Sequence, residues 1–259
     1  MIQNMSFQEK KYKLEIIGFT IEGCLTAEFS GANRVELCDN PLEGGTTPSI
    51  GFIKTARKQL KIGIHPMIRP RGGDFIYSNL EFSIMLDDIR MCKNAGCEGI
   101  VTGLLSSDGT VDKKRLQHIC DLAYPLDVTF HRAFDRTADP FTSLEDIIDA
   151  GCDRILTSGQ ASSAVQGAPL IKEIIGKAND RIIIMPGAGI NSTNIKELAL
   201  TTEATEFHAS ARKCKESIME FFPPGMGGEL KCITVDGEEV KMMIKALGSI
   251  PHENGPRPF

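Results

Sequence analysis

A short glycine-led pattern occurs three times in this chain and constrains its fold more than any other feature. The copies are Gly31-Ala32-Asn33-Arg34-Val35, Gly96-Cys97-Glu98-Gly99-Ile100 and Gly151-Cys152-Asp153-Arg154-Ile155. In each copy a glycine precedes a small residue, a polar residue and an apolar run. Glycine suits the position after a helix, where the backbone often becomes left-handed. The copies start about 55–65 residues apart, which is the length of two strand–helix units of a parallel α/β fold.

Apolar runs of strand length alternate with helical patterns along the rest of the chain. The runs cover residues 14–19, 33–38, 62–69, 99–105, 127–131, 154–158, 181–185 and 205–209. The helical patterns cover residues 21–30, 50–60, 80–95, 113–122, 140–150, 170–177 and 194–200. Eight alternations in about 250 residues favour a single (β/α)8 TIM-type barrel over a doubly wound sheet.

We therefore expect one α/β domain over residues 1–259, with its barrel core at about 13–212 and a final helix at about 236–248. The segment 213–235 contains a Pro-Pro-Gly sequence and has no periodic pattern. It is predicted to be a loop over or beside the barrel mouth.

Composition excludes several functional classes. The formal net charge is −5, whereas nucleic-acid-binding domains usually carry a basic face. No apolar run approaches the roughly 20 residues of a membrane span, and the polar first residues lack the apolar core of a secretory signal. We expect a cytoplasmic protein with neither nucleic-acid nor membrane partners. The eight cysteines form no C-x-x-C pair of a zinc or redox site.

The third apolar run leads into a block rich in charge and glycine, which contains Arg69, Arg71, Gly72, Gly73 and Asp74. Arginine binds anions bidentately, and glycine lets a backbone approach a ligand closely. We expect Arg69, Arg71 and Asp74 to contribute to a ligand site at the carboxyl ends of the strands. The alternative is an arginine–aspartate pair that only fixes a loop.

The fifth and sixth runs end in further polar side chains. His131 is a candidate general base or metal ligand, because its charge changes near neutral pH. Arg132 and Asp135 could hold an anion and orient a neighbour, and Ser158 could add a donor. Asp135 is also a candidate catalytic residue. The alternative for His131 is a buried polar network that shapes the barrel interior.

Two carboxylates and a histidine interrupt the apolar strands themselves. Burying Glu15 or Glu36 without partners would be costly, of the order ~2–7 kcal/mol even for a neutral polar group. Both glutamates therefore need partners, such as the arginines, or a function, and Glu36 is a candidate proton-transfer group. We also place Glu15 and His208 at the barrel mouth as ligand-binding residues.

The glycine-rich run after the seventh strand is a candidate anion cradle. Its Gly187 and Gly189 allow backbone N–H groups to face an anion, assisted by the dipole of the helix that we expect to begin there. A tight turn would also require glycine, so the pattern alone is weak.

Cys38 follows Glu36 at strand spacing, which places both on one side of the strand, and we expect Cys38 to face the barrel mouth. A thiolate could bind Cu(I), the only cofactor that the residues suggest. An inert buried thiol is the alternative.

Together these blocks resemble the CutC family of copper homeostasis proteins. The matching segments are residues 34–38, 43–49, 68–75, 128–135, 156–160, 186–190 and 206–211. The resemblance implies a TIM-type barrel, a cytoplasmic location, a homo-oligomer (dimer or tetramer) and a role linked to copper. Family members often carry a cysteine two residues after the first-strand glutamate, where this chain has Ile17. A two-thiolate Cu(I) site cannot form at that place.

The function expected from the sequence is that of a CutC-like protein in copper homeostasis, with a pocket at the barrel mouth for a small anionic ligand. One alternative is an enzyme of unknown reaction that acts on a phosphate- or carboxylate-bearing molecule and has no direct role with copper. A second alternative is a non-catalytic Cu(I) binder that uses Cys38 together with Met67 or a sulfur from another strand. A third is a scaffold that acts through oligomer contacts.

Overall fold

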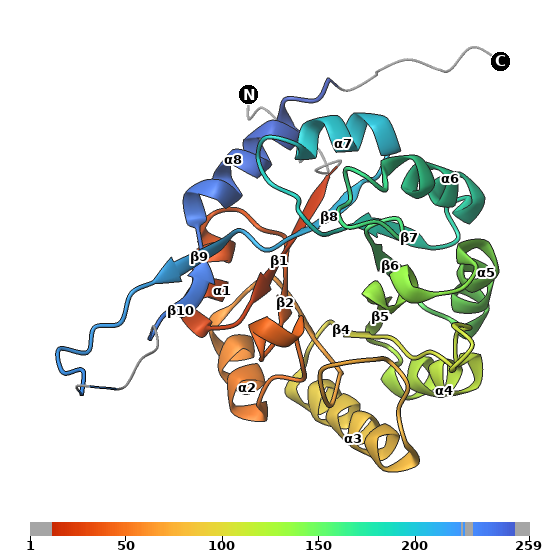
Figure 1. The fold of residues 1–259 in the computed structure, drawn as a ribbon, viewed down its shortest axis with the longest axis horizontal. Helices are drawn as coiled ribbons and strands as arrows, with labels where there is room; N and C mark the ends of the chain where they lie inside the picture. The colour runs from red at the N-terminus through yellow and green to blue at the C-terminus, as the bar shows by residue number, and fades with distance from the viewer. Residues whose placement is uncertain (1–11, 224, 226–229, 252–259) are drawn as a thin grey trace, which may run out of the picture.

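The computed structural model describes residues 12–223, 225 and 230–251 of the chain. Eight parallel strands form a ring at its centre (Figure 1). They are β1 (Lys13–Gly18), β2 (Arg34–Leu37), β3 (Gly63–Pro66), β4 (Gly99–Thr102), β5 (Asp127–Phe130), β6 (Arg154–Thr157), β7 (Ile183–Pro186) and β8 (Glu206–Ala209). Hydrogen bonds link them in the orders β3-β2-β1-β8 and β4-β5-β6-β7, and a bridge between Met67 and Val101 connects β3 to β4. The predicted (β/α)8 barrel is confirmed.

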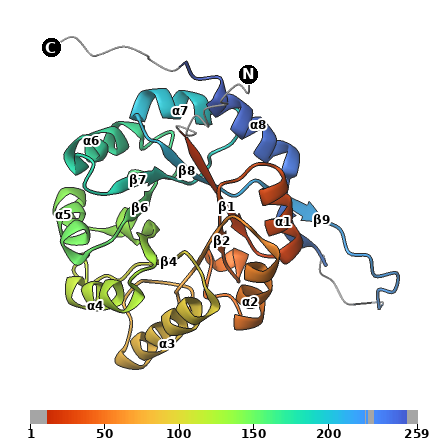
Figure 2. The ribbon, with the colours of Figure 1, turned by 180° about the vertical axis from the view of Figure 1, so that it is seen from behind.

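Among the described residues, eight α-helices surround the strands. Figures 1 and 2 show this outer ring from opposite sides. The helices are α1 (Ile21–Phe29), α2 (Ile50–Gln59), α3 (Asn79–Ala95), α4 (Lys113–Ala123), α5 (Pro140–Ala150), α6 (Ala168–Ala178), α7 (Ile195–Thr202) and α8 (Gly237–Gly248). The 3-10 turns η1 (Pro41–Glu43) and η2 (Arg132–Arg136) lie in the loops after β2 and β5. The repeated glycines have the predicted role, because Gly96 and Gly151 cap α3 and α5 in the left-handed conformation.

Helix α3 illustrates how the sequence builds the outer ring. Its first turn is closed by a capping box, in which Ser78 accepts from the Glu81 backbone and Glu81 accepts from that of Ser78. Met85, Ile89 and Cys92 recur at helical spacing and are fully buried against the barrel. The helix therefore covers the strands with one apolar stripe.

A buried ion-pair network occupies the barrel interior. Glu206 on β8 accepts hydrogen bonds from Arg34 Nη2 at 3.0 Å and from Arg154 Nε at 2.7 Å. Arg34 also donates to Glu15, which lies beside it in the β1–β2 register. The expectation that an arginine partners Glu15 is confirmed.

The segment 213–235, predicted to be a loop, instead contributes to a pair of short antiparallel strands. These are β9 (Arg212–Lys215) and β10 (Cys232–Val235). The arm that they begin projects away from the barrel in Figure 1. Residues 224 and 226–229 of the arm lie outside the described part of the chain.

Within the described residues, no helix has an apolar stretch long enough to cross a bilayer.

Candidate functional site

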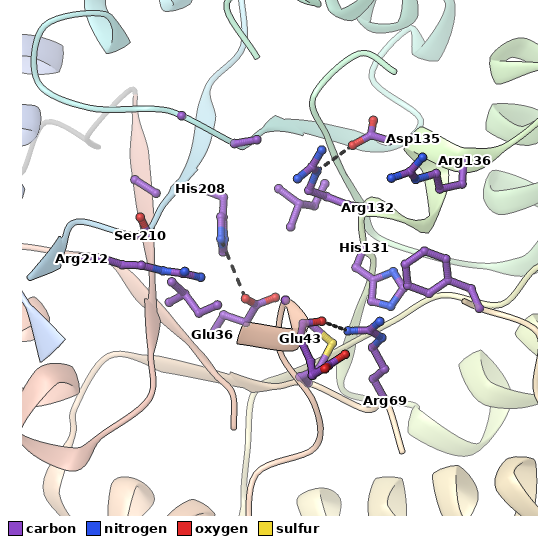
Figure 3. Close-up of a pocket in the computed structure, with 18 residues that line it drawn as sticks. Glu36, Glu43, Arg69, His131, Arg132, Asp135, Arg136, His208, Ser210 and Arg212 are labelled. Carbon is purple, nitrogen blue, oxygen red and sulfur yellow. Dashed lines mark hydrogen bonds and ion pairs between the residues drawn. The ribbon is translucent and has the colours of Figure 1, made fainter. Parts of the chain in front are cut away.

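A cavity of about 430 Å³ opens at the carboxyl ends of the barrel strands (Figure 3). Its wall comes from the residues that end or follow β1, β2, β3, β5, β6, β7 and β8. Four arginines contribute to it, namely Arg69, Arg132, Arg136 and Arg212. Ligand sites of TIM barrels lie at this face, because the loops of all eight strands converge there.

Arg136 and Arg212 provide uncompensated positive charge at the cavity. Neither side chain forms an ion pair with any residue that the structure describes. The guanidinium carbon of Arg212 lies over the ring of Phe19, 5.2 Å from the ring centroid. These two guanidinium groups remain able to bind an anion bidentately.

Arg69 lines the cavity but is largely engaged by the loops around it. Its Nη1 donates to the carbonyls of Glu43 and Gly45, at 2.7 and 2.8 Å, and its Nη2 donates to that of Gly73 at 2.8 Å. Because these partners are neutral carbonyls, the positive charge is not cancelled. Arg69 therefore fixes two loops and adds positive potential to the cavity.

Arg71 and Asp74, which were predicted to bind a ligand, do not line the cavity. Arg71 donates to Glu81 at 2.6 Å and to Asp74 at 3.0 Å, and both side chains of this last pair are exposed. Here the alternative interpretation, a pair that fixes a loop, describes the arrangement.

Arg132, Asp135 and Ser158 form a connected group beside the cavity. Asp135 accepts hydrogen bonds from Arg132 Nε at 2.8 Å, from the Ser158 amide and hydroxyl, and from Thr157. The hydroxyl of Ser158 accepts from Arg132 Nη2 at 2.9 Å but does not line the cavity. With its oxygens already engaged, Asp135 positions Arg132; we therefore correct its predicted catalytic role.

His131 lies buried in the cavity wall, next to Phe75. Burial, together with the charge of Arg69, lowers the pKa of His131 to about 3. Its Nδ1 accepts a hydrogen bond from the Ala133 amide at 3.1 Å, so the proton resides on Nε2, which has no partner among the described residues. His131 is therefore a neutral donor, in place of the general base that we predicted.

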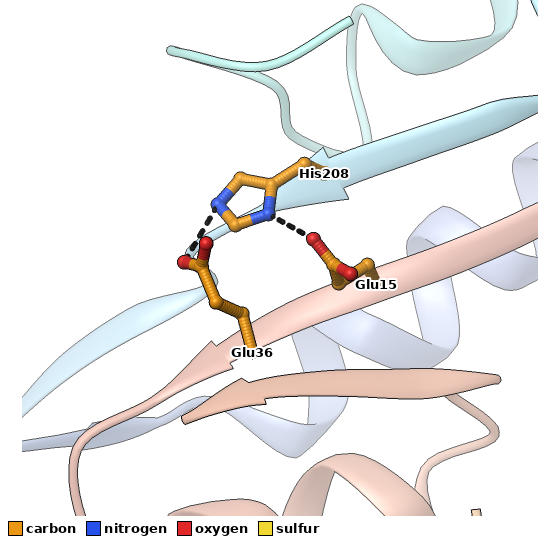
Figure 4. Close-up of side chains that lie close together, drawn as sticks. All are labelled: Glu15, Glu36 and His208. Carbon is orange, nitrogen blue, oxygen red and sulfur yellow. Dashed lines mark hydrogen bonds and ion pairs between the residues drawn. The ribbon is translucent and has the colours of Figure 1, made fainter. Parts of the chain in front are cut away.

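Glu36 and His208 lie together at the cavity wall, and Glu15 lies behind His208 (Figure 4). His208 Nδ1 is 2.7 Å from Glu15 Oε1, and its Nε2 is 3.9 Å from Glu36 Oε2. The β1–β8 register sets Glu15 directly opposite His208, which explains their contact.

The three groups differ in how they ionise. Burial raises the pKa of Glu36 to about 7, against the attraction of His208. Although burial opposes ionisation of Glu15, Arg34 and His208 hold its pKa well below the usual value. Burial likewise opposes protonation of His208, but Glu36 and Glu15 raise its pKa. Glu36 thus titrates near neutral pH beside a carboxylate that stays ionised.

The turn after β7 contributes Ala188 and Gly189 to the cavity, both with positive φ. Gly187 does not line it, and its N–H already donates to the Thr157 carbonyl at 2.9 Å. Helix α7 begins only at Ile195, so the predicted assistance from a helix starting at this turn is wrong.

Cys38 does not face the cavity, contrary to expectation. It is fully buried among Ile17, Met67 and Val101, and its thiol donates to Glu36 Oε2 at 3.5 Å. Burial and the nearby Glu36 charge raise the pKa of this thiol well above its usual value. The side chain is thus a protonated thiol behind the cavity wall.

Sequence reasoning missed Arg136 and Arg212. Arg136 follows Asp135 in the η2 turn, and Arg212 is the third residue after β8. Both would have been found by considering every arginine that lies within three residues of a strand end or in the first turn after a strand.

Comparisons with known proteins agree with the fold. The sequence model of the CutC family matches residues 12–213. A CutC family protein of Chromobacterium violaceum is 50% identical over 214 residues, which cover 83% of this chain and 87% of that protein. A human protein named copper homeostasis protein cutC homolog is 44% identical over 223 residues, covering 85% of this chain and 82% of that protein.

Solved structures give the same result. The crystal structure of a CutC protein from Streptococcus agalactiae superposes with a TM-score of 0.74 at 32% identity, covering 77% of this chain and 98% of that one. Phosphoribosyl anthranilate isomerase from Thermotoga maritima superposes with a TM-score of 0.56 at 16% identity, covering 92% of this chain and 100% of that one. The second similarity concerns the barrel fold alone.

Proposed function

The chain belongs to the CutC family, and from this premise we propose that it serves copper homeostasis through a pocket that binds a small phosphate- or carboxylate-bearing molecule. The observation that carries the proposal is the pair of unpaired guanidinium groups, Arg136 and Arg212, on one cavity. Charge-assisted hydrogen bonds from arginine to such anions are about twice as strong as neutral ones. The copper role itself rests on the names of the mouse and human relatives.

The neutral donor His131 supports an anionic or hydroxylated ligand. Its buried Nε2–H has no partner in the part of the chain that the structure describes, and a buried donor left unpaired costs about 1–3 kcal/mol. A ligand oxygen that reached it would remove this cost. Arg132, held by Asp135 and Ser158, would add a second donor of fixed orientation.

An enzyme that acts on the same ligand is the second candidate. It is favoured by Glu36, whose pKa of about 7 suits proton transfer at neutral pH. No described side chain forms a nucleophile–base pair at the cavity, so we assign no reaction.

Direct Cu(I) binding at Cys38 fits the residues poorly. Ile17 stands where a second thiol would be needed, and the Cys38 thiol is held protonated. A thiolate is the form that binds metal. A Cu(I) titration of the wild type and of Cys38→Ser, in competition with a chromogenic chelator, should give equal stoichiometries. A loss of one equivalent in the variant would restore Cys38 as a copper ligand.

Calorimetric titration with inorganic phosphate, ribose 5-phosphate and succinate tests the anion site. We expect Arg212→Gln and Arg136→Gln each to weaken the best ligand roughly 10-fold or more, since a charged hydrogen bond contributes ~1.5–3 kcal/mol. Arg90→Gln is the matched control, because Arg90 pairs with Asp87 on the exposed face of α3. Equal affinities in all four proteins, or no binding by the wild type, would reject the proposal.

A further inference from the structure

We propose that Glu36 and His208 bind a divalent cation at the cavity wall, with Glu15 as the residue that positions His208. One ligand atom from each of the three side chains lies within 4.8 Å of the others. The inference rests on the proposed function in one respect, because the remaining coordination positions of the cation would face the cavity that takes the anion.

The first argument is the unsatisfied carboxylate of Glu36. The side chain is buried; among the described residues its Oε1 has no hydrogen-bond partner, and its Oε2 accepts a hydrogen bond only from the Cys38 thiol, at 3.5 Å. A thiol is a weak donor, and buried polar groups in native proteins almost always have partners. Protonation would not solve the problem, since a carboxylic acid O–H would itself need an acceptor. A cation between Glu36 and His208 would satisfy the carboxylate.

The second argument is the orientation of His208. Glu15 stays ionised because it accepts from Arg34, so its Oε1 accepts the Nδ1–H of His208 at 2.7 Å. Nε2 then faces Glu36 (Figure 4), where a cation would take the place of its proton. A carboxylate that fixes the tautomer of a metal-binding histidine in this way is a recurrent arrangement at metal sites.

The third argument is the distance between the two ligand atoms. His208 Nε2 and Glu36 Oε2 are 3.9 Å apart, too far for a hydrogen bond. Metal bonds to nitrogen and carboxylate oxygen are ~2.0–2.2 Å long, so two ligands of one ion can lie up to ~4.4 Å apart. The gap is below this upper limit, so one ion can bridge the two atoms.

The donor set also indicates which ion. One imidazole and one carboxylate, with water or ligand oxygens completing the shell, suit Mn²⁺, Fe²⁺, Co²⁺ or Zn²⁺ better than the sulfur-preferring Cu(I). Arg34 does not oppose the ion with a free charge, because it is paired with both Glu15 and Glu206. The ion would in turn present a positive charge to an anion in the cavity.

Titration with Co²⁺ in phosphate-free buffer tests the site, because the visible bands of cobalt report its coordination. We expect one equivalent to bind without a sulfur-to-cobalt charge-transfer band. Glu36→Gln and His208→Gln should each lower the affinity at least 100-fold, and Glu15→Gln should lower it by about 10–100-fold, as loss of an outer-shell partner does. His118→Gln removes an exposed histidine on α4 and should leave the affinity unchanged.

Anomalous diffraction from cobalt-soaked crystals of the wild type tests the same site without relying on a variant that folds. A cobalt peak between Glu36 and His208 supports the proposal. A peak at Cys38, a charge-transfer band abolished by Cys38→Ser, or no peak at the cavity would overturn it. Phosphate binding measured without metal separates the two proposals, since intact phosphate binding with no cobalt site would reject the cation site alone.

Discussion

Replacing Glu206 with glutamine should destabilise the barrel by about 3–5 kcal/mol, the usual cost of removing one member of a buried ion pair. The carboxylate accepts from Arg34 and Arg154, and all three side chains are less than 10% exposed. Glutamine keeps the size of the side chain and one acceptor oxygen but removes the charge. Arg34 would retain Glu15, whereas Arg154 would retain only Thr129 at 3.3 Å and a longer contact with Asp127.

The comparison that isolates burial is Glu145→Gln. Glu145 also receives two arginine N–H groups, both from Arg181 at 2.7 Å, but its side chain is 51% exposed and that of Arg181 is 43% exposed. Exposed pairs of this kind contribute about 0–1 kcal/mol. The two variants thus remove the same charge and a similar set of hydrogen bonds from opposite environments.

Urea unfolding followed by circular dichroism and by tyrosine fluorescence measures both effects, since the chain has three tyrosines and no tryptophan. Coincident transitions would justify a two-state treatment. In a thermal scan, ~3–5 kcal/mol corresponds to a fall of roughly 6–20 °C for a domain of this size. A loss below about 1 kcal/mol in Glu206→Gln, or an equal loss in Glu145→Gln, would show that burial does not control the strength of these pairs.

The remaining predictions concern a buried histidine, a close backbone contact and the thiols. Between pH 6.5 and 3, His131 is protonated in the unfolded chain but neutral in the native protein, because burial lowers its folded pKa to about 3. The free energy of unfolding should therefore fall by up to ~1.4 kcal/mol per unit as pH decreases, and His131→Gln should flatten the pH dependence of the urea midpoint; an unchanged slope contradicts this. Gly187→Ala should cost about 1–3 kcal/mol in urea unfolding, since an added Cβ would lie 2.4 Å from Leu156 Cδ1; a loss under 0.5 kcal/mol would mean that the neighbour yields freely, as surface changes do. Ellman's reagent should modify two thiols of the native protein, Cys214 and Cys232, because the other six are buried; faster reaction at any other cysteine would refute the burial pattern.

The architecture could be predicted from the sequence because helix periodicity and glycine caps are local signals. The helix predicted over residues 80–95 is α3 (Asn79–Ala95), and the one predicted over 140–150 is α5 (Pro140–Ala150). Strand ends were less accurate. The third run was predicted to reach residue 69, whereas β3 ends at Pro66, because Met67 and Ile68 stay buried after the chain leaves the ladder. Apolar residues indicate buried positions, and buried positions continue past the end of the strand. An apolar run therefore overestimates the length of the strand.

The β9–β10 arm shows the opposite case. All four residues of β9 are exposed, so the strand carries no alternation of buried and exposed positions for a sequence pattern to reveal. Its pairing with β10 spans a segment rich in proline and glycine, which predicts a loop. The pairing of β9 with β10 is identified only by the hydrogen bonds between the two strands.

The candidate site was the least predictable part, because composition places a charge without telling what neutralises it. Arg69 and Arg71 looked equivalent in the sequence, yet one holds loop carbonyls in the cavity wall and the other pairs with Glu81 outside it. Arg136, by contrast, is left without a counter-charge among the described residues.

The two buried glutamates make the same point more sharply. A single rule, that a buried carboxylate needs a partner, predicted a partner or a function for both Glu15 and Glu36. The strand register then separated them: it sets Arg34 opposite Glu15, and it sets His65 opposite Glu36. Burial lowers the pKa of His65 to about 3, so that ring stays neutral and offers Glu36 no charge. Glu15 thus has a strong partner within the fold, whereas Oε1 of Glu36 has none among the described residues. This is why the cation and the anion are both proposed at its side of the cavity.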